Sequence, residues 1–258
     1  MINSTQVYEL VSSIVLDAEI ASVATADAIS VATSASVSAS QTLSIARAEA
    51  WRQLRARSIF PLDVPLFAVD GDPVAALSPA ERTVLALSLR LKRSDEEVAE
   101  ISGIQRKELQ GLLKEARRQL ARAAIAMTML TNDTRCPVTS QAQQTLGATL
   151  KRSQAMNLVS HAAECSICVP VLRTVDRQII ADYINAAPMS MPTSIDDRIA
   201  SYSDAERSTL LSRAGLKTGW APPDTNLNQD PRRLLKRAAL LGAISALCIV
   251  VGLIVAAR

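Results

Sequence analysis

Three cysteines and the only histidine of the chain follow the spacing C-x24-H-x3-C-x2-C, which constrains the fold more than any other feature of the 258 residues. These residues are Cys136, His161, Cys165 and Cys168. Thiolates and a neutral imidazole are the ligands that Zn²⁺ takes in closed, tetrahedral structural sites. A helix places His161 and Cys165 on one face, and Cys168 follows within reach at the next turn. We therefore predict a structural zinc site around which residues 136–168 must fold.

Two other interpretations of these residues stay open. The three thiols could be buried without a metal while His161 lies at the surface, or zinc-bound thiolates could also sense oxidants by pairing as a disulfide. The pattern argues against a catalytic zinc, because protein ligands would fill all four positions. His161 is also the only residue through which a Ser-His-Asp hydrolase could work. We predict no enzyme activity and no catalytic residues.

Residues 238–257, near the C-terminus, contain no charged side chain. A helix of this length spans about 30 Å, the thickness of the hydrocarbon core of a bilayer. We predict a transmembrane helix over residues 237–257; the alternative, a buried core helix, is seldom apolar on every side. The fourth cysteine, Cys248, falls in this stretch.

Basic residues on either side of this stretch predict its orientation. Four of them precede it, namely Arg232, Arg233, Lys236 and Arg237, and only Arg258 follows. The positive-inside rule therefore places residues 1–237 in the cytoplasm. No Lys or Arg occurs before Arg47, so the N-terminus does not resemble a signal peptide. We predict a single-pass protein of the cell membrane with cytoplasmic N-terminal domains, where structural disulfides are not expected.

The composition favours an all-α fold. Apolar residues make up 48% of the chain and aromatic residues only 3%, and 8 Gly and 11 Pro are too few for a protein of strands and turns. The net charge of +3 is too small to indicate nucleic-acid binding by itself. Any surface that binds DNA must therefore arise from local clustering of basic residues.

Two capping boxes mark consecutive helices in the middle of the chain. Ser78 is followed by a proline and, three residues on, by Glu81. Glu97 likewise lies three residues after Ser94. Gly103 ends the second helix, and an arginine-rich helix is expected over residues 105–124. A short helix, a glycine turn and a longer basic helix form the helix-turn-helix pattern. Upstream, residues 42–57 predict a basic amphipathic helix, whereas residues 28–40 fit either a helix of small residues or a linker.

The motif HAAECSIC, with Cys136 upstream, resembles the zinc-binding anti-sigma domain, a small helical bundle that wraps bacterial alternative sigma factors. The resemblance covers residues 136–183. The preceding part resembles a sigma factor of the extracytoplasmic-function type: residues 77–123 are similar to region 4, which reads the −35 promoter element, and residues 7–62 are similar to region 2. The chain departs from the family at Gln110, Gly111 and Leu112, where basic and small polar residues are usual.

The resemblance implies an all-α fold: a degenerate sigma-like helical module with a helix-turn-helix, a small zinc-binding helical bundle and a single C-terminal transmembrane helix. We predict region 2-like helices over 1–60, a linker over 61–76, a region 4-like helix-turn-helix over 77–130, an anti-sigma-like domain over 131–185 and a tether over 186–236. The residues expected to contact DNA are Gln105, Arg106, Lys107, Lys114, Arg117 and Arg118. A solvated helix face is the alternative for these cations.

The expected function is that of a membrane-anchored transcription regulator of the sigma/anti-sigma type. Its zinc domain would control either the chain's own sigma-like module or a separate sigma factor. The alternative is an active membrane-tethered sigma factor that binds promoter DNA and the RNA polymerase core and is regulated by its own zinc domain. A third interpretation is an adaptor whose helical domains serve protein contacts only.

Overall fold

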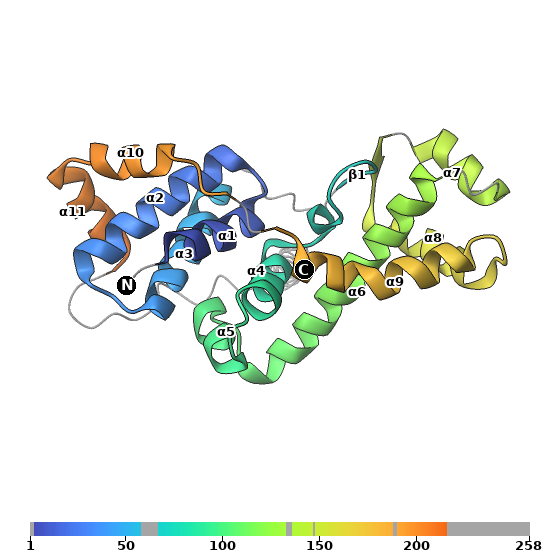
Figure 1. Ribbon diagram of the computed structural model, residues 1–258, viewed down its shortest axis with the longest axis horizontal. Coiled ribbons are helices and arrows are strands. Elements are labelled where there is room, and N and C mark those ends of the chain that lie inside the picture. The colour runs from blue at the N-terminus through green and yellow to red at the C-terminus, as the bar shows by residue number, and fades with distance from the viewer. Residues whose placement is uncertain (1–2, 58–66, 133–135, 147, 188–189, 216–258) are drawn as a thin grey trace, which may run out of the picture. The chain divides into compact units, whose positions relative to one another are not determined.

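The computed structural model describes residues 3–57, 67–132, 136–146, 148–187 and 190–215, which all belong to one unit of the chain, residues 1–223. Almost all of these residues that have regular secondary structure are helical (Figure 1). The predicted all-α class is confirmed, apart from one pair of two-residue strands.

Three helices form the N-terminal part of the core: α1 (Ser4–Val15), α2 (Ala18–Ala35) and α3 (Ala39–Ala56). Each begins with a side chain that caps its first turn, from Asn3, Asp17 and Ser38 respectively. All three pack on one another, which small residues on α2 permit because they let the helix backbones approach closely. The run over 28–40, left open between helix and linker, is therefore mostly helix.

The next helices are α4 (Pro79–Leu85), the π-helical turn η2 (Ala86–Arg90), α5 (Asp95–Ser102) and α6 (Arg106–Thr131). Both predicted capping boxes are confirmed, with Ser78 and Ser94 each exchanging hydrogen bonds with the glutamate three residues on. Gly103 ends α5 in the left-handed region at φ 68°. Helix α6 runs past the expected end near residue 124, because buried side chains continue along it to Leu130.

Gly111 lies exposed inside α6, and a Cβ at this position would meet nothing within 4 Å. Gly111→Ala should therefore raise the free energy of unfolding by about 0.5–1 kcal/mol, because alanine restricts the unfolded chain without a clash. Gly103→Ala is the matched control and should lower the same quantity by about 1–2 kcal/mol, since its backbone is left-handed. Urea unfolding measures both variants, and a destabilised Gly111→Ala would contradict the expectation.

The predicted linker over 61–76 contains two elements. Strand β1 (Phe67–Ala68) pairs antiparallel with β2 (Thr149–Leu150), and the 3₁₀ turn η1 (Pro73–Ala76) packs against α6. Phe67 lies opposite Leu150, and both side chains are buried together with residues of α6. The second half of this segment is thus fixed to the core by apolar contacts.

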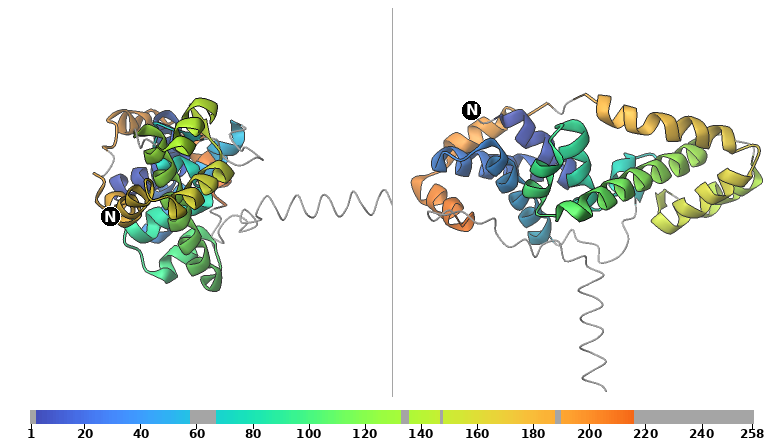
Figure 2. Two further views of the ribbon diagram at one scale, coloured as in Figure 1. Left: turned by 90° about the vertical axis from the view of Figure 1, so that its right-hand side faces the viewer. Right: turned by 90° about the horizontal axis from the view of Figure 1, so that it is seen from below.

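Helices α7 (Pro137–Leu146), α8 (Arg152–Glu164) and α9 (Val169–Asn185) follow. All three pack against α6, and α8 also packs against α9 (Figure 1). The last described helices are α10 (Ser194–Ser201) and α11 (Asp204–Arg213), which pack against α2 (Figure 2). Between these two helices Tyr202 is extended, and Ser203 begins α11 with its own capping box. Part of the predicted tether over 186–236 therefore lies on the core.

The predicted transmembrane helix over 237–257 and its flanking residues Arg232, Arg233, Lys236 and Arg237 lie outside the described residues. Within the described ranges, no single helix is both long and apolar enough to cross a bilayer; α8 and α9 meet the criterion only as a pair bent by 119°.

Candidate metal centre

Three of the four predicted zinc ligands lie around the turn that joins α8 to α9, and the fourth lies at the start of α7. His161 lies in the last turn of α8, and the backbone N–H of Cys165, the residue that ends α8, donates to the His161 carbonyl. A tight turn then brings Cys168 to the position just before α9, where Pro170 occupies the first turn. Cys136 directly precedes α7, and its carbonyl accepts the first hydrogen bond of that helix. The chain thus delivers ligands from three helix ends to one point.

The ligand atoms of Cys136, His161, Cys165 and Cys168 all lie within 4.8 Å of one another. The Sγ of Cys136 is 3.2 Å from Nε2 of His161 and 3.9 Å from the Sγ of Cys165, and the Sγ of Cys168 is 3.8 Å from the same Nε2. A tetrahedron with Zn–S bonds of about 2.3 Å has edges of about 3.8 Å. The cluster can therefore hold one metal ion, and its size and donor set are compatible with zinc.

Apolar side chains shield one side of the cluster from solvent. Cys136 and Cys168 are fully buried against Ile125, Met129 and Ala162, whereas His161 and Cys165 are half-buried. Four protein ligands would complete the coordination of a tetrahedral ion, which leaves no position for a substrate. The chemistry that the arrangement offers is structural: it ties α7, α8 and α9 together against α6.

Two of the thiols have opposite acid–base properties in the metal-free chain. The backbone N–H of Thr139, the largest influence, and a bond with His161 together lower the pKa of Cys136 to about 6, against the effect of burial. Burial raises the pKa of Cys168 to about 12, aided by its contacts with the neighbouring thiols. Cys136 therefore loses its proton more readily than Cys168, and a bound cation would favour the thiolate form of both.

The six residues expected to contact DNA all lie on or just before α6 and are exposed to solvent, and none of them belongs to the metal cluster. Gln105, Arg106 and Lys107 form the start of the helix, where Arg106 makes an exposed ion pair with Glu96 at 2.7 Å. Lys114, Arg117 and Arg118 lie further along, on the border of a pocket between α6 and α9. The structure therefore separates the six into two groups with different surroundings.

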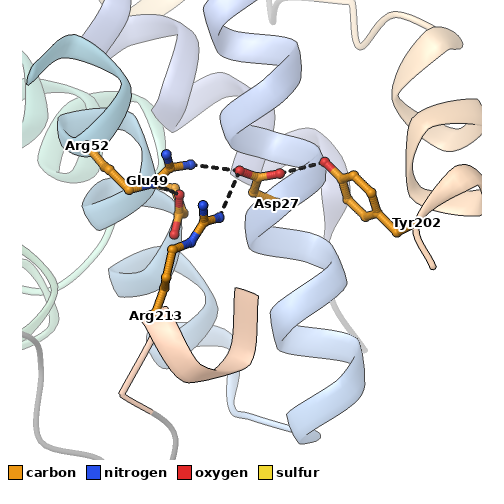
Figure 3. Close-up of polar contacts among 5 residues, drawn as sticks. All are labelled: Asp27, Glu49, Arg52, Tyr202 and Arg213. Carbon is orange, nitrogen blue, oxygen red and sulfur yellow. Dashed lines mark hydrogen bonds and ion pairs between the residues drawn. The ribbon is translucent and has the colours of Figure 1, made fainter. Parts of the chain in front are cut away.

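Sequence reasoning missed a second cluster, which centres on Asp27 of α2 (Figure 3). This buried carboxylate accepts from the Tyr202 hydroxyl at 2.5 Å and pairs with Arg52 at 2.8 Å and Arg213 at 3.4 Å. Burial, and secondly the bond to Asp27, raises the pKa of Tyr202. The signal in the sequence was the isolation of Asp27, the only charged residue between positions 20 and 46.

Comparison with known proteins adds no relative to these observations. No protein-family model matches the chain, and neither the curated proteins nor the solved structures give a match.

Proposed function

We propose that this protein is a membrane-anchored transcription regulator of the sigma/anti-sigma type, in which a zinc-binding domain holds the chain's own sigma-like module in cis. One observation carries the proposal. The segment that begins at the Cys₃His cluster contacts both parts of the sigma-like module, through α8 and α9 on α6 and through α10 and α11 on α2. The membrane anchor in this proposal rests on the sequence of residues 232–258.

The packing of α8 and α9 on α6 supports control of the helix that would read DNA. Ile125 and Met129, near the end of this helix, lie against the metal cluster, while Gln105, Arg106 and Lys107 lie at its beginning. Helix α9 lies beside the stretch between these two ends. In the proposed mechanism, zinc fixes α8 and α9 on the helix that would otherwise read DNA.

The packing of α10 and α11 on α2 supports control of the surface that would bind RNA polymerase core. Tyr202, between α10 and α11, and Arg213, the last residue of α11, both bind Asp27 (Figure 3). Arg52 of α3 binds the same carboxylate, so one buried acid joins two helices of the sigma-like module to the C-terminal segment. In the proposed mechanism, α10 and α11 cover the surface through which the module would bind RNA polymerase core.

A specific observation favours a second candidate function, that of an active membrane-tethered sigma factor regulated by its own zinc domain. Gln105, Arg106 and Lys107 are exposed at the start of α6, where a helix that enters the major groove makes its base contacts. Binding of the phosphate backbone by these cations would need no rearrangement of α9.

The test uses the full chain in lipid nanodiscs with purified core RNA polymerase. We expect the zinc-loaded wild-type chain to bind no polymerase, and the Asp27→Asn chain treated with a chelator to bind it. Transcription by the zinc-loaded wild-type chain would favour the active sigma factor instead. Co-purification of a separate sigma factor with that chain would contradict control in cis, and failure of every form to bind polymerase or a sigma factor would end the sigma-type proposal.

Asp27→Asn should also loosen the packing of residues 194–215 on α2. The change removes the charge that Arg52, Arg213 and the Tyr202 hydroxyl share, and hydrogen bonds to a charged group contribute about 1.5–3 kcal/mol. Amide hydrogen exchange in residues 194–215 should become about tenfold to a hundredfold faster, because this segment opens more often. Glu19→Gln is the matched control, since Glu19 lies on the same helix in an exposed pair at 3.5 Å. Equal exchange in the two variants would show that Asp27 does not hold the segment.

A further inference from the structure

A pocket of about 390 Å³ opens between α6 and α9, next to the core of the metal cluster. Its volume is in the range of sites for small molecules, which are about 300–1,000 Å³. The side chains that line it come from α6, α8 and α9, and they fall into an aliphatic and a charged group. The aliphatic ones are Ala121, Ile125, Val159, Leu172 and Ile180, and the charged ones are Lys114, Arg117, Arg118, Arg122 and Asp176.

The charged group has an excess of cations. Four basic side chains face one carboxylate, Asp176. Glu115 pairs with Arg118 at 2.8 Å and with Arg122 at 3.9 Å, so its single negative charge partly compensates both arginines. Lys114 and Arg117 make no ion pair with any residue in the described ranges. Two cations are therefore available to an anionic group at the border of the pocket.

The aliphatic side chains favour a ligand whose remaining part is a hydrocarbon. Ile125 is buried, and Val159, Leu172 and Ile180 are half-buried, so the pocket offers hydrocarbon rather than hydrogen bonds. No aromatic side chain lines the pocket, whereas proteins that bind single-stranded nucleic acids use aromatic rings on which bases stack. A concave aliphatic surface is also unlike a face that tracks a DNA backbone, which needs cations and polar groups alone.

The geometry points to a binding site for a fatty acid, whose carboxylate would bind between Lys114 and Arg117 while its hydrocarbon chain packs on Ile125, Leu172 and Ile180. Such a ligand contacts α6 and α9 at once and therefore stabilises the packing of one on the other. Ile125 and Leu172 also belong to the apolar core around the metal cluster, so the ligand and the metal would support the same arrangement. That regulatory consequence rests on the proposed function, whereas the binding site does not.

The experiment is photo-crosslinking of the zinc-loaded full chain in nanodiscs with a diazirine derivative of dodecanoic acid, followed by mass spectrometry. We expect labels on the peptides that contain Ile125, Leu172 and Ile180, and we expect octanoate to compete for them. Lys114→Glu/Arg117→Glu should reduce this labelling by more than about tenfold, because two charge-assisted contacts are lost. Lys107→Glu, an exposed change on the same helix outside the pocket, should leave it unchanged.

Three results would overturn the assignment. The first is equal labelling of the double variant and the Lys107→Glu control, with zinc content and helicity retained in both. The second is equal labelling by the matched aliphatic amine probe, which carries the opposite charge. The third is competition by duplex DNA as effective as that by octanoate, which would identify a nucleic-acid surface. These results do not depend on polymerase binding, so failure of the site and failure of the proposed function are distinguishable.

Discussion

Cys165→Ser is expected to release the metal and to unfold residues 136–185 while α1–α3 stay folded. Cys165 is half-buried and serine has nearly the same shape, so the change removes a ligand without opening a cavity in the core. In structural zinc sites, metal binding contributes about 10–16 kcal/mol of apparent free energy, most of which is also free energy of folding. Of the three helices, α7 buries only Thr139 and α9 only Tyr183, and α8 buries three small or aliphatic side chains, so the metal supplies much of the free energy that holds them together.

The measurements are metal content by mass spectrometry and hydrogen exchange of residues 136–185 in the same sample. Cys248→Ser is the first control and should retain the metal, because Cys136, His161, Cys165 and Cys168 already supply the four ligands of a tetrahedral ion. His161→Cys is the second and should also retain it, because four thiolates make a common structural zinc site. A Cys165→Ser chain that keeps one equivalent of zinc and native exchange rates would show that the ligand set is wrong.

Arg90→Ala should lower the free energy of unfolding by about 3–5 kcal/mol, the typical cost of leaving one partner of a buried ion pair alone. The Nε of Arg90 lies 2.7 Å from a carboxylate oxygen of Glu9, and both side chains are about nine-tenths buried. The same guanidinium donates to the carbonyls of Ala186 and Ala187 and lies over the ring of Tyr183, 5.7 Å from its centre. One side chain therefore joins α1, η2 and the end of α9, and its loss leaves the Glu9 carboxylate buried without a cation.

Urea unfolding of the zinc-loaded chain measures this effect. Arg106→Ala is the matched control, because its pair with Glu96 is exposed and should contribute about 0.2–1 kcal/mol. Adding Glu9→Gln to Arg90→Ala should recover part of the loss, since the second change removes the unpaired charge. Similar stabilities for the Arg90→Ala and Arg106→Ala chains would mean that the Glu9–Arg90 pair is not a junction between these helices.

Local chemistry explains what the sequence could predict. The capping boxes at Ser78 and Ser94 act over three residues, so they can be recognised without knowledge of the fold. The metal cluster joins residues up to 32 positions apart, but ligand chemistry restricts its members to the single histidine and the cysteines. In both cases the residues that can form the interaction are few: a glutamate three positions after the serine, and a histidine or a cysteine as metal ligand.

The contacts that sequence reasoning missed are distant in the chain and chemically ordinary. Glu9 and Arg90 are separated by 81 residues, and Asp27 and Tyr202 by 175. Many carboxylates and arginines in this chain could form such pairs, and only packing selects them. The helix over residues 28–35 was undecided for a related reason: alanine and serine fit helix and linker alike, and burial against α1 and α3 makes the choice.

Helix α6 connects the metal cluster with the basic residues at its own first turn. It is a continuous rod of 26 residues, about 39 Å long, with Arg106 in its first turn and Met129 against the metal cluster. A rod without a hinge transmits twist: if loss of the metal lets its far end turn about the axis, Arg106 and Lys107 swing through the same angle.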